Sequence, residues 1–297
     1  MPSEAASTDP AGLALAELIA MRPRVVRGNL PPGARIPGGE RIGLRRAQGS
    51  DFDGIGPYQP GDDIRKIAWG ASARSGRIQT KQFIADAHRA RMIMLDDRAI
   101  FSFGTSGRPM GKTAALAAAF LIWEAVVLQE AVGLAFLSSP RISAPRRGSG
   151  YAMTLLDRLS AAYARQIAGE NGNETDALAD RLNDSAALLR HGDEICMVSD
   201  FSGLADDIRE VSRTLEPMRD LRAFVVEDAM IHHGLGSGRY PVEAPGRTEF
   251  RDLRIKSSQD DQRAAAVRLR RETDRELAQL GWSVFEAEAC LAGLGKV

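Results

Sequence analysis

Acidic residues follow two apolar segments of the chain, in positions where parallel β-strands carry their ligand sites. Asp96 and Asp97 follow the run Met92–Leu95, and Asp200 follows Ile195–Ser199. In an open parallel sheet, ligands bind beyond the carboxyl ends of the strands, where the strand order reverses. Carboxylates at such a point suit a hard cation such as Mg²⁺. The spacing predicts that Asp96 and Asp200 converge there, or that these acids cap the helices that follow them.

A glycine-containing loop is a second candidate for chemistry. The loop comes after a predicted strand and opens a predicted helix; it runs from Gly107 to Gly111 and is followed by Lys112 and Thr113. A phosphate-binding loop needs four residues between its glycines, whereas three stand here. We therefore expect Lys112 and Thr113 to begin an ordinary helix.

Other catalytic patterns are missing from the sequence. The four histidines show no metal-ligand spacing with one another or with the two cysteines, and no nucleophile elbow is present. The sequence therefore predicts a binding or adaptor protein that is not an enzyme. The alternative is a metal-dependent phosphohydrolase. Residues available to metal or phosphate chemistry are Asp96, Asp97, Asp200, Lys112, Ser199, Ser202 and Thr105.

Composition limits the partners and the compartment. Lys+Arg and Asp+Glu both total 39, so the whole chain of 297 residues has no net attraction for nucleic acid. One basic segment, Arg22–Arg46, holds seven arginines and a single acid, and is either a solvated arm or a contact for an acidic partner or phosphates.

Cys196 and Cys290 lie in apolar runs typical of buried, reduced thiols. Residues 1–10 lack a signal-peptide pattern, and Ala114–Trp123 is too short to cross a bilayer, which favours the cytoplasm.

The hydrophobic pattern of the sequence predicts the strands and helices that hold the candidate residues. Runs without polar alternation are typical of strands covered on both faces, and strands that alternate with helices predict an α/β fold with a Rossmann-like, doubly wound, mostly parallel sheet. The predicted strands are Ile78–Phe83, Arg91–Leu95, Val132–Leu137, Glu194–Ser199, Leu221–Glu227 and Trp282–Ala287. The predicted helices are Gly12–Met21, Thr113–Gln129, Tyr151–Ala164, Thr175–Leu189, Leu204–Leu215 and Gln259–Gln279.

A turn-rich segment ahead of the predicted sheet has an unusual composition. It combines a rigid turn at Pro60–Gly61, acidic helix caps at Asp62 and Asp63, a cationic side from Arg65 and Lys66, and an aromatic residue, Trp69. We expect a helical turn over Ile64–Trp69 with Trp69 as a buried anchor. The segment then forms a clasp that holds the N-terminal arm to the sheet.

On these residues the chain resembles the bacterial domain-of-unknown-function family 58. That family carries a Tyr-x-Pro-Gly-Asp-Asp-x-Arg signature followed by Trp and Ser-Ala-Arg. The matching residues are Tyr58, Pro60, Gly61, Asp62, Asp63, Arg65, Ile67, Trp69, Ser72, Ala73 and Arg74. The resemblance implies a von Willebrand factor A-like domain over 89–297, preceded by an irregular, β-containing clasp over 41–88 and an N-terminal helix and Gly/Pro-rich arm over 1–40.

The resemblance also implies a metal-ion-dependent adhesion site, from which this sequence departs. That site begins with Asp-x-Ser-x-Ser, whereas Asp96 is followed here by Arg98 and Ile100 in place of both hydroxyl residues. An arginine beside a cation site is electrostatically unfavourable, and Ile100 cannot coordinate a metal. Asp96 and Asp200 are thus expected to form a degenerate, unoccupied metal site without a resident cofactor. Arg98 is expected to pair with Asp96 or Asp200.

Members of that family are similar to proteins that act beside MoxR-type AAA+ ATPases. The resemblance implies a partner of such an ATPase and of client proteins, in chaperone-like assembly or maturation of protein complexes. Many members carry N-terminal membrane helices, and this sequence predicts a variant without them. Nucleic-acid binding through Arg22–Arg46 is a third reading, and salt-dependent binding would distinguish it.

Overall fold

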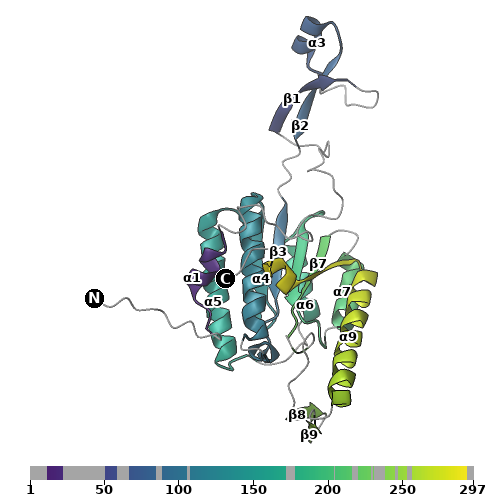
Figure 1. Ribbon diagram of the computed structural model, residues 1–297. Coiled ribbons are helices and arrows are strands. Elements are labelled where there is room, and N and C mark those ends of the chain that lie inside the picture. Colours follow the sequence, from purple (N-terminus) through teal and green to yellow (C-terminus); the bar gives the residue numbers. More distant parts are fainter. Residues whose placement is uncertain are drawn as a thin grey trace, which may run out of the picture. The chain divides into compact units, whose positions relative to one another are not determined.

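The computed structural model describes most of the chain, and its contacts define two compact units. One unit comprises residues 1–35 and 89–297 and is called here the α/β unit; the other, residues 36–88, is the hairpin unit (Figure 1). The residues described are 12–22, 51–58, 67–84, 89–105, 108–171, 178–203, 205–215, 220–228, 230, 238–244, 247–252 and 256–292.

A six-stranded sheet organises the α/β unit. Its strand order is β10-β7-β6-β3-β4-β5, with β5 antiparallel to β4 and the other neighbours parallel. Read in chain order these strands are 3-2-1-4-5-6, a doubly wound topology in which β3 and β6 flank the reversal. The predicted Rossmann-like fold of von Willebrand factor A type is consistent with this sheet. The strands are β3 (Ala90–Leu95), β4 (Ala131–Phe136), β5 (Ser139–Arg146), β6 (Glu194–Ser199), β7 (Asp220–Val225) and β10 (Trp282–Glu286).

Helices cover both faces of this sheet, which explains the unbroken apolar runs of its central strands. Ile93 and Leu95 of β3 pack into one buried cluster with α1, α4, α5 and α10, whereas Met92 and Met94 pack into another with α6, α7 and α9. Figure 1 shows the two helical layers. The helices are α1 (Leu15–Ala20), α4 (Met110–Val127), α5 (Ser149–Ile167), α6 (Leu178–Ala187), α7 (Ala205–Leu215), α9 (Lys256–Gln279) and α10 (Ala287–Ala292).

Helix α4 is the central helix of one layer. Apart from Lys112, Thr113 and Glu124 it is apolar, and its residues from Met110 to Ala125 are all buried, as expected for a helix surrounded by protein. Its 18 residues exceed the apolar segment Ala114–Trp123 recognised in the sequence. Among the described residues it alone is long and apolar enough to cross a membrane, and 89% of it is buried inside the fold.

Helix α1 packs against α4 and α5. Leu18 is fully buried, and its carbonyl oxygen accepts a 2.9 Å hydrogen bond from Nε1 of Trp123. The sequence predicts residues 1–40 as a separate segment, but the apolar side of this helix completes the core of the α/β unit.

The hairpin unit is built on two antiparallel strands, β1 (Asp51–Pro57) and β2 (Gln79–Ile84), with α3 (Trp69–Ser75) between them in the chain. Ser72 ties α3 to β2, since its Oγ accepts a 2.9 Å bond from the Gln79 N–H. Trp69 is not the predicted buried anchor: its exposed fraction is 71%. No residue of the short helix α3 is buried, because a two-stranded sheet offers little apolar surface to cover it.

Several elements were not predicted. Strand β5 contains Pro140 and Pro145, which are typical of an edge strand and mask its pattern. The antiparallel pair β8 (Arg239–Ala244) and β9 (Arg247–Asp252) is short and polar. Helix α3 begins at the residue where the predicted helical turn Ile64–Trp69 ends, and residues 59–66 of the signature lie outside the described residues.

Candidate functional site

The carboxyl ends of β3 and β6 bring the predicted acidic residues together. Asp96 directly follows β3, and its N–H donates a 2.9 Å bond to the Val198 carbonyl of β6. Because this bond extends the ladder between the two strands, Asp96 lies beside Ser199 and Asp200. The site therefore lies at the topological reversal of the sheet, where the sequence predicts it.

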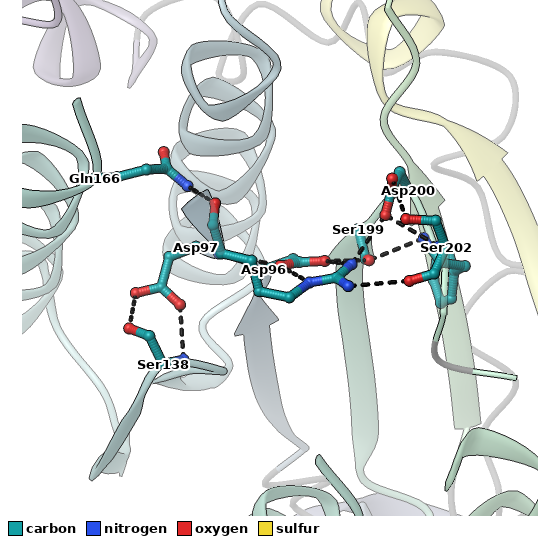
Figure 2. Close-up of polar contacts among 9 residues, drawn as sticks. Asp96, Asp97, Ser138, Gln166, Ser199, Asp200 and Ser202 are labelled. Carbon is teal, nitrogen blue, oxygen red and sulfur yellow. Dashed lines mark hydrogen bonds and ion pairs between the residues drawn. The ribbon is translucent and has the colours of Figure 1, made fainter. Parts of the chain in front are cut away.

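Arg98 occupies the space between the two carboxylates. Its Nε donates to Oδ1 of Asp96 at 2.8 Å and its Nη2 to Oδ2 at 2.6 Å, a two-pronged contact. The same Nη2 reaches Oδ1 of Asp200 at 3.0 Å, and Nη1 donates to the Ser202 carbonyl at 3.0 Å. The predicted pairing of Arg98 with these acids is confirmed. We call Asp96, Arg98, Ser199, Asp200 and Ser202 the Arg98 cluster (Figure 2).

Hydroxyl groups complete the hydrogen bonding of both carboxylates. Ser199 Oγ donates to Oδ2 of Asp96 at 2.6 Å, and Ser202 Oγ donates to Oδ2 of Asp200 at 2.6 Å. Ser199 Oγ also accepts the Phe201 N–H at 2.9 Å. Phe201 has a φ of 59°, a left-handed backbone conformation that is costly for an aromatic residue. The strained turn holds Asp200 and Ser202 toward Arg98.

Burial and charge act on the Arg98 cluster in opposite directions. Burial alone would lower the pKa of Arg98, but hydrogen bonds and charge from Asp96, then Asp200, raise it above its ordinary value. Burial raises the pKa of Asp200, against the opposing effects of its bonds from Ser202 and the charge of Arg98. Arg98 therefore stays charged throughout the pH range in which the protein is folded.

Asp97 takes no part in this cluster. Its side chain turns to the loop after β4, where the Ser138 N–H donates to Oδ1 at 2.8 Å and the Ser138 hydroxyl bonds Oδ2. Figure 2 shows Asp97 facing Ser138 and away from Asp200. Burial raises the pKa of Asp97 despite these bonds. The carboxylate fixes the β3 and β4 loops to each other.

Two other residues named as candidates also lie outside the cluster. Thr105 donates its backbone N–H to Oδ2 of Asp228 at 2.8 Å, and its hydroxyl bonds the same carboxylate. Lys112 extends its Nζ to the Gly12 carbonyl at 2.6 Å and to Glu17 at 3.3 Å. Thr105 is therefore not an oxygen donor beside Asp96, and Lys112 anchors α1.

The loop before α4 also differs from a phosphate-binding loop. A Cβ at Gly111 would lie 2.1 Å from Oε1 of Gln166, so this side chain of α5 packs directly against the first turn of α4. Gln166 in turn donates from Nε2 to the Arg98 carbonyl at 3.0 Å. Gly111 thus permits close packing of α4 and α5 below the site.

A divalent cation does not fit the Arg98 cluster. Both oxygens of Asp96 already accept bonds from Arg98, and the guanidinium would repel a second cation. Ile100, in the short 3₁₀ helix η2 (Ala99–Ser102), offers no oxygen and is 42% exposed. Across the described part of the chain, no three His, Cys, Asp or Glu side chains are grouped as ligands for a metal.

The signature residues belong to the hairpin unit. The Tyr58 N–H bonds the Ile78 carbonyl at 3.0 Å, and Nε of Arg74 bonds the Gly70 carbonyl at 3.0 Å. The first bond joins the ends of the hairpin and the second lies within α3, whereas the bonds of Ala68 and Ser72 to Gln79 hold α3 on the hairpin. The remaining signature residues, Pro60, Gly61, Asp62, Asp63 and Arg65, lie outside the described residues.

A second charged cluster was missed by sequence reasoning. Arg91 of β3 contacts Glu194 and Glu124 at 2.5 Å and Glu130 at 3.2 Å, while Arg222 of β7 bonds Glu194 at 2.9 Å. We call these five residues the Arg91 cluster. The available signal was a charged residue at the start of an apolar strand, but the acidic partners of Arg91 lie 33 to 103 positions away in the chain.

The fold and the site define a class: a Rossmann-like α/β protein whose paired carboxylates bind an arginine of the same chain. A family model described as "Protein of unknown function DUF58" matches residues 55–276. The chain belongs to this family.

Curated relatives and solved structures extend the comparison. Uncharacterised proteins of Mycobacterium bovis and Mycobacterium tuberculosis are 35% identical over 86 residues, which is 28% of this chain and 27% of theirs. The chain thus spans about a quarter of the length of these relatives. An aerotolerance-related membrane protein of Bacteroides fragilis aligns at 12% identity and a TM-score of 0.38, over 70% of this chain and 100% of that one. The hypothetical protein BatB of Bacteroides thetaiotaomicron aligns at 10% identity and a TM-score of 0.39, over 69% of this chain and 95% of that one.

Proposed function

We propose that this chain is a non-catalytic protein-interaction module that works with a MoxR-type AAA+ ATPase in the assembly or maturation of protein complexes in the cytoplasm. One observation carries the proposal: Arg98 fills the position between Asp96 and Asp200. The positive charge at the reversal of the sheet comes from the chain itself. Partner binding at this edge then needs no divalent cation.

The surface beside the Arg98 cluster has the composition of a protein contact. Phe103 is 55% exposed and Ile100 is 42% exposed, and they follow Arg98 in the chain by five and two residues. Protein interfaces are enriched in aromatic side chains and depleted in free charge at their centres. Arg98 pairs with both neighbouring carboxylates, so each of them has a cationic partner from the chain itself.

The same contacts argue against the phosphohydrolase alternative. Asp96 and Asp200 are engaged by Arg98, Asp97 faces Ser138, and Lys112 faces α1. A hydrolytic metal centre would need these groups to converge on one substrate. Phosphoester turnover that requires Mg²⁺ and disappears in Asp96→Asn would contradict the proposal.

A cation titration tests the observation that carries the proposal. Mg²⁺ or Mn²⁺ should leave the melting temperature of the full chain unchanged, since a ligand raises it only by binding the folded state. In Arg98→Ser, which removes the guanidinium, the same ions should raise the melting temperature. A rise in the unchanged protein would show that the site binds metal.

Co-purification tests the partner. The tagged full chain, with ATP present, should recover a MoxR-type AAA+ ATPase from its native cytosol, and Phe103→Asp should reduce that recovery about tenfold, as expected for an interface aromatic residue. Leu269→Asp is the matched control, because Leu269 is 65% exposed on α9. Repeated recovery of no AAA+ protein would contradict the partner assignment.

A further inference from the structure

A groove lies between the last turns of α7 and α9, two helices on the same side of the sheet. It encloses about 800 Å³. Its floor includes Leu280 and Gly281, where the chain leaves α9 for β10 with a φ of 83° at the glycine. Because Gly281 has no side chain, the chain can turn there without filling the groove.

Arginines dominate the walls of this groove. Arg209 pairs with Glu276, and both side chains are partly exposed. Arg213 and Arg275 are exposed, and within the described part of the chain neither makes an ion pair or hydrogen bond. Glu272 is the remaining acid of the lining. Two arginines therefore line one groove without a carboxylate partner among the described residues.

Arg213 and Arg275 differ in this respect from Arg270. Arg270, on the same helix α9, is held by Glu227 and by Asp274. Its guanidinium stabilises the packing of α9, whereas Arg213 and Arg275 leave their donors available to a ligand. An arginine fork matches a carboxylate with two parallel hydrogen bonds.

An apolar pocket adjoins the charged groove. It encloses about 40 Å³ and shares Glu276 and Leu280 with the groove. Its other lining residues are Phe201, Ile208, Thr273 and Leu277. A ligand that reaches both recesses combines negative charge with a small apolar group.

We propose that this groove binds an acidic peptide segment of a partner protein, with carboxylates on Arg213 and Arg275 and a small apolar side chain toward Leu280. Charge complementarity carries the choice of occupant. Glu272 and Glu276 line the same groove and would repel the continuous phosphates of a nucleic acid, whereas a peptide can space its carboxylates to avoid them. Phe201 lines the apolar pocket and also lies in the turn of the Arg98 cluster, but the proposal does not depend on the ATPase partner.

Fluorescence anisotropy of the full chain with a short labelled peptide of glutamate and valine tests this proposal. Arg213→Gln and Arg275→Gln should each weaken binding about fivefold, and the double variant on the order of twentyfold, as expected for partly solvated ion pairs. Arg271→Gln is the matched control, since Arg271 is exposed on α9 outside the groove. Added salt should weaken binding to the unchanged protein.

Three outcomes would overturn the proposal. One is unchanged affinity in the double variant, and another is an equal loss in the Arg271 control. The third is tighter binding of a single-stranded oligonucleotide than of the peptide, lost in the same variants. Melting temperatures equal to that of the unchanged protein would show that the variants remain folded.

Discussion

Two arginine-centred clusters lie at opposite ends of the same parallel strands, and they differ in what their charges hold. The Arg91 cluster joins β3, β6, β7 and the residue before β4 to helix α4, at the amino ends of the strands. The side chains of Arg91, Glu124 and Glu194 are no more than 3% exposed there. The Arg98 cluster joins two loops at the carboxyl ends, and Asp200 is 17% exposed there. The same kind of ion pair is therefore enclosed at one end and partly exposed, through Asp200, at the other.

Electrostatics reflects this difference. Although burial opposes ionisation, Arg91 and Arg222 lower the pKa of Glu194 to about 2. At the other end, burial outweighs the same kind of partner and raises the pKa of Asp200. Arg222 also lies 4.9 Å from the ring centre of Phe224 and 4.8 Å from that of Phe285, which fixes it further. The amino-end cluster is the more strongly coupled one.

Removing the central arginine of the core cluster should have the largest effect. Arg91→Met leaves the buried Glu124 and Glu194 without their main cation, so the free energy of unfolding should fall by about 3–5 kcal/mol. Urea denaturation followed by circular dichroism measures this. A loss below that of an exposed pair would show that the Arg91 cluster contributes little to the fold.

Acid should separate the clusters next. Because the pKa of Glu194 is about 2 in the folded protein against 4.5 for a free side chain, its ionised form stabilises the fold above about pH 4.5. That contribution, on the order of 3 kcal/mol, is lost as the pH falls from 4.5 toward 2. Urea denaturation over this range should show a steep loss for the unchanged protein and a shallower one for Glu194→Gln. Parallel curves would contradict the pKa assignment. The raised pKa values of Asp97 and Asp200 act in the opposite sense in both proteins.

Removing Arg98 should cost less than removing Arg91. In Arg98→Ser, Asp96 keeps its hydrogen bonds from the Ser199 hydroxyl and from the backbone N–H of residue 98. Asp200 keeps its bond from the Ser202 hydroxyl and its partial access to water. We expect a loss of about 1–3 kcal/mol, measured by urea denaturation without divalent ions. A loss equal to that of Arg91→Met would remove the distinction between the two clusters.

An exposed ion pair sets the lower end of the comparison. Arg108 and Glu288 pair at 2.6 Å with side chains 39% and 53% exposed. Arg108→Gln should change the free energy of unfolding by less than about 1 kcal/mol, because solvent screens such a pair. Urea denaturation of this variant gives the reference against which the losses in Arg91→Met, Glu194→Gln and Arg98→Ser are compared. A change as large as that of Arg98→Ser would mean that burial does not determine the order.

The sequence predicted the end of the sheet that faces solvent better than the buried one. Asp96 and Asp200 were found because acids after apolar strands occupy a known position of parallel sheets, and the Arg98 pairing followed from an arginine two residues from Asp96. The Arg91 cluster was missed because burial of Arg91 depends on partners brought together only by folding. The prediction that Trp69 is buried was wrong for a similar reason. A large aromatic side chain is buried only where other elements pack over it, and the sequence does not show whether they do.

The position of Arg98 has a consequence for how the site responds to its surroundings. A bound metal ion exchanges with the solution, so a site that uses one depends on ion concentration and is emptied by chelators. Arg98 is attached two residues from Asp96, and its guanidinium has a high, fixed effective concentration at both carboxylates. Ion depletion or chelation therefore leaves the charge at this edge of the sheet in place.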